Sequence, residues 1–236
     1  MKKIDTNNNV YTIIYATVIV VIVALLLAVV SSALKPKQQA NVELDIKKQI
    51  LSSLNLDLAG QDVDALYEKI ISVDTIAMVQ DKTGADVPQV VYLATLDDGS
   101  CKYIIPMRGA GLWGAIWGYL ALNDDKNTIY GTFFNHDSET PGLGGEIATR
   151  GFQTRFNDKH INGVKGLLLE IVKGEAQGEQ VQAISGATIT SKGVEAMINS
   201  TLADYKDFLE AQVQLAEPEV EIQVADSVAE NEQIEK

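Results

Sequence analysis

The segment Gln180–Leu209, which reads QVQAISGATITSKGVEAMINSTLADYKDFL, decides the fold. Its first residues, Gln180–Ile184, predict a short strand. From Ser191 onward, apolar residues recur three and four positions apart, namely Val194, Met197, Ile198, Leu202, Tyr205, Phe208 and Leu209. This spacing is typical of an amphipathic helix and predicts one that ends near Gln212. The core of the chain therefore closes with a strand, a short turn and a helix.

The turn between them, Ile184–Ser191 (ISGATITS), consists of small and hydroxyl residues. Ser and Thr at such a place commonly cap the following helix, and from the residues alone capping is the simpler interpretation. A phosphate ester is the alternative, because the N-terminus of a helix favours an anion and Gly186 and Ala187 leave space around it. Thr188 would then be the point of attachment.

The sequence upstream of this segment predicts an α+β fold. Short helices are expected around Ile46–Leu54 and Leu66–Ile70, where apolar residues follow helical spacing. Five runs rich in β-branched and aromatic residues predict strands, namely Ser72–Val79, Val87–Leu96, Lys102–Ile105, Thr128–Phe134 and Gly166–Val172. The turn Asp97-Asp98-Gly99 closes the second of them. A mostly antiparallel sheet with flanking helices fits this order.

The N-terminal part contains an uncharged block, Val10–Leu34, long enough to cross a ~30 Å hydrocarbon layer as a helix. A signal peptide is the competing interpretation, but its apolar core is only ~7–15 residues long. We therefore expect a transmembrane anchor, although lysines on both flanks leave its orientation open. The predicted organisation is a tail at 1–9, the membrane helix at 10–34, a linker at 35–41, a domain at 42–214 and an acidic disordered tail at 215–236.

Composition excludes several function classes. The formal net charge of −13 would repel a polyanion, so we expect no nucleic-acid partner. Cys101 is the only cysteine, and His136 and His160 are the only histidines, so we assign no metal site.

Two glycine-rich segments are candidates for ligand binding. Gly109, Gly111 and Gly114 form a literal GxGxxG, but only AIWGYLAL follows instead of a long helix, which argues against a dinucleotide site. Beside these glycines, Leu112, Trp113 and Trp117 either fill the core, the simpler interpretation, or form an apolar wall for a flat aromatic ligand. The segment Glu139–Glu146 (ETPGLGGE) has three glycines whose backbone N–H groups could bind a polar ring edge.

SGATITS, ETPGLGGE and GLWGAIWGYLAL, together with the single N-terminal membrane helix, resemble the C subunit of the Na+-translocating NADH:quinone reductases over residues 1–212. The related G subunit of Rnf-type complexes shares SGAT and ETPGLG but differs at GLWG and at Gly145-Glu146, which favours the Na+ pump.

The resemblance implies an FMN-binding domain in which a flavin transferase takes FMN from FAD and joins its phosphate to Thr188. Glu139, Thr140, Leu143 and Leu112 would lie against the flavin, with Ser185, Gly186 and Ala187 beside its phosphate. The family pattern has Asp six positions before the threonine, where this chain has Gln182.

The resemblance also implies a role as an electron-carrying subunit of a membrane-bound NADH:ubiquinone reductase, with its flavin domain on the extracytoplasmic side of a bacterial inner membrane. The protein would relay electrons among other subunits without oxidising NADH itself. The alternatives are an Rnf-type electron carrier and a membrane-anchored binding domain in which SGAT is only a helix cap.

Overall fold

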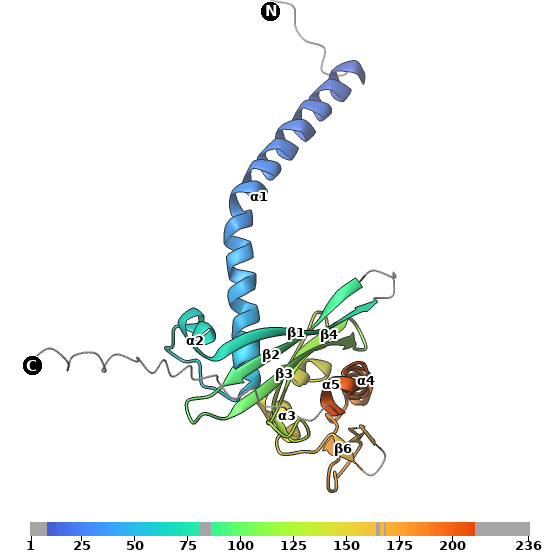
Figure 1. Ribbon diagram of the computed structural model, residues 1–236. Helices are drawn as coiled ribbons and strands as arrows, with labels where there is room; N and C mark the ends of the chain where they lie inside the picture. The colour runs from blue at the N-terminus through green and yellow to red at the C-terminus, as the bar shows by residue number, and fades with distance from the viewer. Residues whose placement is uncertain (1–8, 81–85, 164–165, 168, 211–236) are drawn as a thin grey trace, which may run out of the picture.

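The computed structural model of the protein describes residues 9–80, 86–163, 166–167 and 169–210. The described chain begins with one long helix, α1 (Asn9–Ser53), which projects away from the rest of the molecule (Figure 1). The segment 35–41, predicted as a linker, is helical and lies inside α1. Pro36 removes one backbone donor from this helix, and α1 bends along its length (Figure 1).

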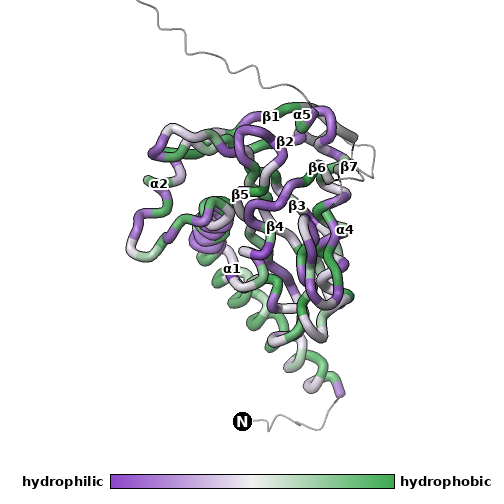
Figure 2. The backbone as a smooth tube through the Cα atoms, turned by 90° about the horizontal axis from the view of Figure 1, so that it is seen from below, coloured by the Kyte–Doolittle hydropathy of each residue, from purple (hydrophilic) through white to green (hydrophobic). Residues whose placement is uncertain are grey.

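The outer part of α1 is apolar on all sides. Its most apolar window has a mean hydropathy of 3.2, and none of that window is buried. Figure 2 shows hydrophobic residues around most of its turns. By length and composition α1 is a candidate membrane span, which fits a single-pass anchor. The tails predicted at 1–9 and 215–236 lie outside the described residues, apart from Asn9.

The sheet confirms the predicted α+β class. Five antiparallel strands follow one another in chain order: β1 (Ile71–Gln80), β2 (Asp86–Thr95), β3 (Cys101–Ala110), β4 (Ala115–Leu122) and β5 (Ile129–His136). The predicted turn between β2 and β3 is confirmed, since Gly99 has φ +79° and its N–H donates to the carbonyl of Leu96 at 2.9 Å. The sequence did not predict β4, because nearly all its residues are buried and the polar–apolar alternation of a half-exposed strand is missing.

One face of the sheet is covered by the inner end of α1 and by α2 (Val63–Ile70), as predicted. Ile50, Leu51 and Leu54 of α1 are fully buried against it. An ion pair of 2.7 Å between Lys47 and Asp64 joins the two helices. The long helix α1 and the domain are thus parts of one packed unit.

The other face carries the larger core. It is covered by η1 (Gly144–Ala148), α3 (Arg150–Gln153), η2 (Thr154–Phe156) and α4 (Thr188–Asp204). The rings of Phe134, Phe152 and Phe156 contact one another at centroid distances of 5.2–6.1 Å. The predicted closing helix is two helices, because α4 ends before Tyr205 and α5 (Lys206–Glu210) follows.

The segment between η2 and α4 contains only short strands. These are β6 (Asn162–Gly163) paired with β7 (Gly166–Leu167), and β8 (Ile171–Val172) paired in parallel with β9 (Val181–Gln182). The strand expected over Gly166–Val172 is therefore divided into β7 and β8. β9 confirms the strand expected before the turn, in shorter form, and it leads directly to residues 184–191.

Candidate functional site

The SGAT segment forms a tight turn. The N–H of Ala187 donates to the carbonyl of Ile184 at 3.1 Å, and Gly186 between them has φ +77°. A positive φ at this third position is the mark of a type II turn, and it favours glycine. A Cβ on Gly186 would also lie 2.9 Å from Cδ2 of Leu143, so the turn contacts the ETPGLGG loop.

Helix α4 begins directly after this turn without a side-chain cap. Its N-cap residue is Ala187, and in the part of the chain that the structure describes no side chain caps the first N–H groups, so the interpretation of Ser185 or Thr188 as a helix cap is wrong. Ser191 instead stabilises the turn, since its hydroxyl accepts from the N–H of Ile184 at 3.0 Å and donates to the carbonyl of Ala187 at 2.9 Å. The N–H groups of the first turn of α4 therefore have no acceptor within the helix and can bind an anion.

The two threonines at this helix start differ in their surroundings. Thr190 is 1% exposed, and its hydroxyl donates to Oε2 of Glu139 at 2.7 Å. Thr188 is half-buried, beside the exposed Ser185 and Gly186. Among the described residues, no hydrogen bond engages the Thr188 hydroxyl.

Glu139 brings the three sequence motifs together. Its Oε1 accepts from the N–H of Trp113 in the GLWG loop at 2.8 Å, while its Oε2 accepts from Thr190. Burial raises the pKa of the Glu139 carboxyl, but these hydrogen bonds outweigh burial and hold its pKa below the ordinary glutamate value. The buried carboxylate is therefore ionised at neutral pH.

Exposed apolar side chains surround this junction. Leu112 is 47% exposed, Trp113 68%, Leu143 43% and Ile189 64%. The interpretation of Leu112 and Trp113 as core residues is therefore wrong, whereas an apolar wall for a flat ligand fits their exposure. Ile189 was not predicted as part of this wall, although an isoleucine of α4 outside the apolar stripe was a signal for it.

The GxGxxG glycines do not open a helix, as the sequence predicts. Gly114 leads into β4, so no helix N-terminus follows the glycines. Trp117, on β4, is half-buried, and its Nε1 donates to Oε1 of Gln49 on α1 at 3.0 Å.

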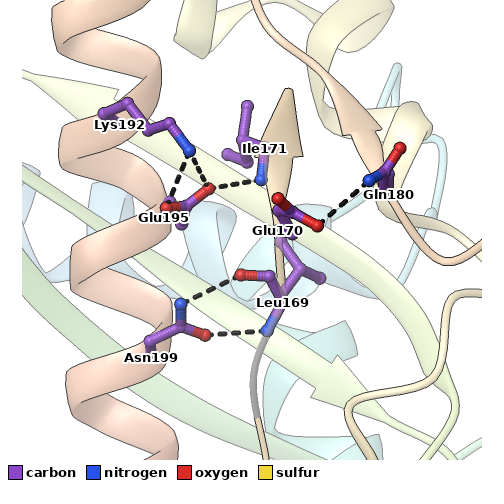
Figure 3. Close-up of polar contacts among 7 residues, drawn as sticks. All are labelled: Leu169, Glu170, Ile171, Gln180, Lys192, Glu195 and Asn199. Atoms are coloured by element: carbon purple, nitrogen blue, oxygen red, sulfur yellow. Dashed lines mark hydrogen bonds and ion pairs between the residues drawn. The ribbon is translucent and has the colours of Figure 1, made fainter. Parts of the chain in front are cut away.

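The body of α4 is held in place by side-chain bonds to the segment before β8, shown in Figure 3. The Asn199 amide accepts from the N–H of Leu169 at 2.8 Å and donates to its carbonyl at 2.9 Å. Glu195 accepts from the N–H of Ile171 and pairs with Lys192. Asn199 starts a glycosylation-like triplet, but both polar groups of its side chain are engaged within the fold.

The site lies at the end of the sheet that points toward the apolar part of α1. The start of β5 contacts the inner end of α1, since a Cβ on Gly131 would lie 2.3 Å from the carbonyl oxygen of Ser53. At the other end of β5, Asp137 lines an open groove of about 660 Å³ together with Asn41 and Asp45 of α1. Glu139 follows two residues later. The three loops that meet at Glu139, namely the GLWG loop, the ETPGLGG loop and the SGAT turn, therefore lie toward the candidate membrane span.

Comparison with known proteins connects this geometry to a family. Residues 111–203 match the model of the FMN-binding domain, and this range contains all three loops. The C subunit of the Na+-translocating NADH-quinone reductase from Pseudomonas aeruginosa is 31% identical over 211 residues, covering 71% of this chain and 81% of that protein. This chain belongs to the C-subunit family of Na+-translocating NADH-quinone reductases.

A second relative, the C subunit from Vibrio alginolyticus, is 30% identical over 75% of this chain and 84% of that protein. The crystal structure of the C subunit from Parabacteroides distasonis superposes with a TM-score of 0.67 and 35% identity, covering 76% of this chain and 98% of that one. The predicted family and fold are thus confirmed. The individual flavin contacts expected at Leu112, Glu139, Thr140, Leu143, Ser185, Gly186, Ala187 and Thr188 remain predictions.

Proposed function

We propose that this protein carries FMN through a phosphoester bond on Thr188 and relays electrons within a Na+-translocating NADH-quinone reductase. The family match and the FMN-binding domain support an electron-carrying flavoprotein subunit of this multisubunit enzyme. The observation that carries the finer proposal is the contrast between Thr188 and Thr190. Of the two threonines at the uncapped start of α4, only Thr188 has a hydroxyl that the fold leaves available.

The residues at this helix start fit a phosphate diester. The first N–H groups of α4 and the positive end of its dipole both favour an anion, and α4, at 17 residues, has a full dipole. Gly186 has no side chain to obstruct the turn, and Ser185 beside it is exposed. A phosphate on Thr188 would occupy the position that a capping side chain fills in other helices.

The exposed apolar side chains fit the flat ring of a flavin. Leu143 contacts Gly186 in the turn, and Leu112 precedes Trp113, whose N–H is bonded to Glu139. Leu143 is therefore held against the SGAT turn, and Leu112 is joined to the start of α4 through the bonds of Glu139 to Trp113 and Thr190. The bound FMN would supply the redox chemistry, since flavins accept and donate electrons singly or in pairs. The protein contributes the position of the ring and its exclusion from water on one side.

Electron transfer to membrane-embedded partners fits the location of the site. The three loops face the apolar part of α1, so a flavin there would lie toward the bilayer and the neighbouring subunits. We place the domain on the extracytoplasmic side. Covalent attachment is advantageous there, because a released FMN would be lost, while a tethered one rebinds at high effective concentration.

Attachment requires a flavin transferase that uses FAD as donor. It would recognise the segment before Thr188, where Gln182 is exposed while its backbone carbonyl accepts from Arg155 at 2.9 Å. The Gln182 side chain is therefore free to meet the transferase even though its backbone is held in the fold.

The test is intact mass spectrometry and in-gel fluorescence of the full chain produced together with the transferase. We expect the wild type to carry one FMN minus water and to fluoresce after denaturing electrophoresis. Thr188→Val should abolish both signals, and Thr190→Val should keep them. A non-fluorescent wild type, or loss in Thr190→Val alone, would contradict the proposal.

A further inference from the structure

The Glu139 carboxylate lies between three segments that are far apart in the sequence: the GLWG loop, the ETPGLGG loop and the start of α4. It is 4% exposed, and each of its oxygens accepts a hydrogen bond from a different segment: Oε1 from the N–H of Trp113 in the GLWG loop and Oε2 from the hydroxyl of Thr190 in the first turn of α4. The lengths of 2.8 and 2.7 Å are those of charge-assisted bonds. The side chain is thus fully committed to bonds within the protein.

Two glycines provide the space for this carboxylate. A Cβ on Gly111 would lie 2.4 Å from Oε1, and a Cβ on Gly144 would lie 2.2 Å from Oε2. Neither position could hold a side chain without displacing Glu139. Gly111 belongs to the GLWG loop and Gly144 to the ETPGLGG loop, so both motifs are shaped around the same carboxylate.

The backbone of Glu139 is held as well. Its N–H donates to Nδ1 of His136 at 3.2 Å. His136 also borders Gly145, where a Cβ would lie 3.1 Å from Nε2. His136 at the end of β5 therefore fixes the backbone of Glu139, while the carboxylate oxygens bond the GLWG loop and the start of α4.

We propose that Glu139 is a positioning residue that locks the GLWG loop, the ETPGLGG loop and the start of α4 into one arrangement. This inference rests on the proposed function for the identity of the ligand, and it gives Glu139 a role different from flavin contact. Its carboxylate sets where Leu112 and Leu143 stand relative to Thr188, and so fixes the orientation of a flavin tethered there. Without this lock the flavin would stay attached but its ring would move freely.

The test compares four variants of the full chain with a matched control, all produced with the transferase. Glu139→Ala removes both bonds. Glu139→Gln keeps an acceptor for Trp113 and offers Thr190 an amide donor, which the hydroxyl can accept. Thr190→Val removes one donor with little change of shape, and Thr190→Ser restores it. The control is Glu146→Ala, which alters a glutamate of the same loop for which no hydrogen bond of the side chain is seen among the described residues.

The first readout is hydrogen exchange of the Trp113 amide, which needs no flavin. We expect its protection to fall at least about tenfold in Glu139→Ala, because a bond to a charged acceptor is of the stronger kind. Glu139→Gln, which keeps a neutral acceptor for the Trp113 N–H, should show protection between that of Glu139→Ala and wild type, and Glu146→Ala should stay at the wild-type value. Unchanged protection in Glu139→Ala would overturn the lock.

The second readout is the fluorescence anisotropy and the visible circular dichroism of the attached flavin. Both should fall in Glu139→Ala, and to a smaller extent in Thr190→Val, while intact mass still shows one flavin. Thr190→Ser should restore both signals. Wild-type anisotropy in Glu139→Ala despite lost Trp113 protection would overturn the positioning role. If the wild type carries no covalent flavin but Glu139→Ala loses protection, the proposed function fails and the lock stands.

Discussion

Replacing Asn199 with alanine should destabilise the fold strongly although the residue lies outside the site. The Asn199 amide bonds both the N–H and the carbonyl of Leu169, a residue that is 3% exposed (Figure 3). Losing one partner of a buried backbone group costs ~1–3 kcal/mol. Glu170 next to it is exposed, so water can reach part of this segment, and we expect a total loss of about 2–3 kcal/mol for both groups.

The measurement is thermal unfolding of the detergent-solubilised chain, followed by circular dichroism. For a domain of this size, 1 kcal/mol corresponds to ~2–4 °C, so Asn199→Ala should lower Tm by about 5–10 °C. Asn199→Asp should lower Tm at least as much as Asn199→Ala, because it places a carboxylate oxygen next to the carbonyl oxygen of Leu169. Ser200→Ala, on the next position of α4, should change stability by less than ~0.5 kcal/mol. An equally small change in Asn199→Ala would refute the reasoning.

Three further predictions concern the sheet and its turns. Gly131→Ala should destabilise the protein by ~1–3 kcal/mol in urea unfolding, because the new Cβ would meet the carbonyl of Ser53, whereas Gly151→Ala, with its nearest neighbour 4.0 Å away, should be neutral. Trp117→Phe should cost ~1 kcal/mol in the same assay by removing the bond to Gln49. Burial raises the pKa of the Asp125 carboxyl, but the hydrogen bonds from Thr128 and from the N–H of residue 127 outweigh burial and lower the pKa below the ordinary aspartate value. The contribution of Asp125 to stability should therefore be present at neutral pH and be lost as the pH falls below that value. Asp125→Ala should reduce this loss of stability in acid.

Much of the fold could be predicted from local patterns. The apolar part and the inner end of α1, the helix α2, four of the five sheet strands and the turn at Gly99 follow from hydropathy, periodicity and turn residues. The helical segment 35–41 between the two parts of α1 was predicted as a linker instead. Strand β4 could not be found in this way, because a central strand covered on both faces has no alternation to detect. The break at Tyr205 was also missed, because the apolar spacing continues from α4 into α5 while the backbone does not.

The site could be predicted in part. Its segments were recognisable from SGAT, ETPGLGG and GLWG, but the residues alone favoured a helix cap and a core tryptophan, and both interpretations were wrong. A cap is a matter of backbone position: the N-cap is Ala187, one residue before the threonine that could have served. Trp113 is exposed because it lies in the loop between β3 and β4, outside the sheet, and the spacing of apolar residues does not predict the path of that loop.

The glycines that imitate a dinucleotide fingerprint show why a motif needs its structural context. Gly109 is required because a Cβ there would lie 2.7 Å from the Cβ of Met197, so α4 crosses the end of β3 at close range. Gly111 is required because a Cβ there would meet the Glu139 carboxylate. A Cβ on Gly114 would lie 3.2–3.3 Å from side-chain atoms of Ser138 and Asp137. The absence of a side chain at each glycine is thus required by a different neighbour within the protein. The spacing arises because three separate elements converge on one short stretch of strand and loop, and the Glu139 carboxylate at that convergence also joins this stretch to the start of α4.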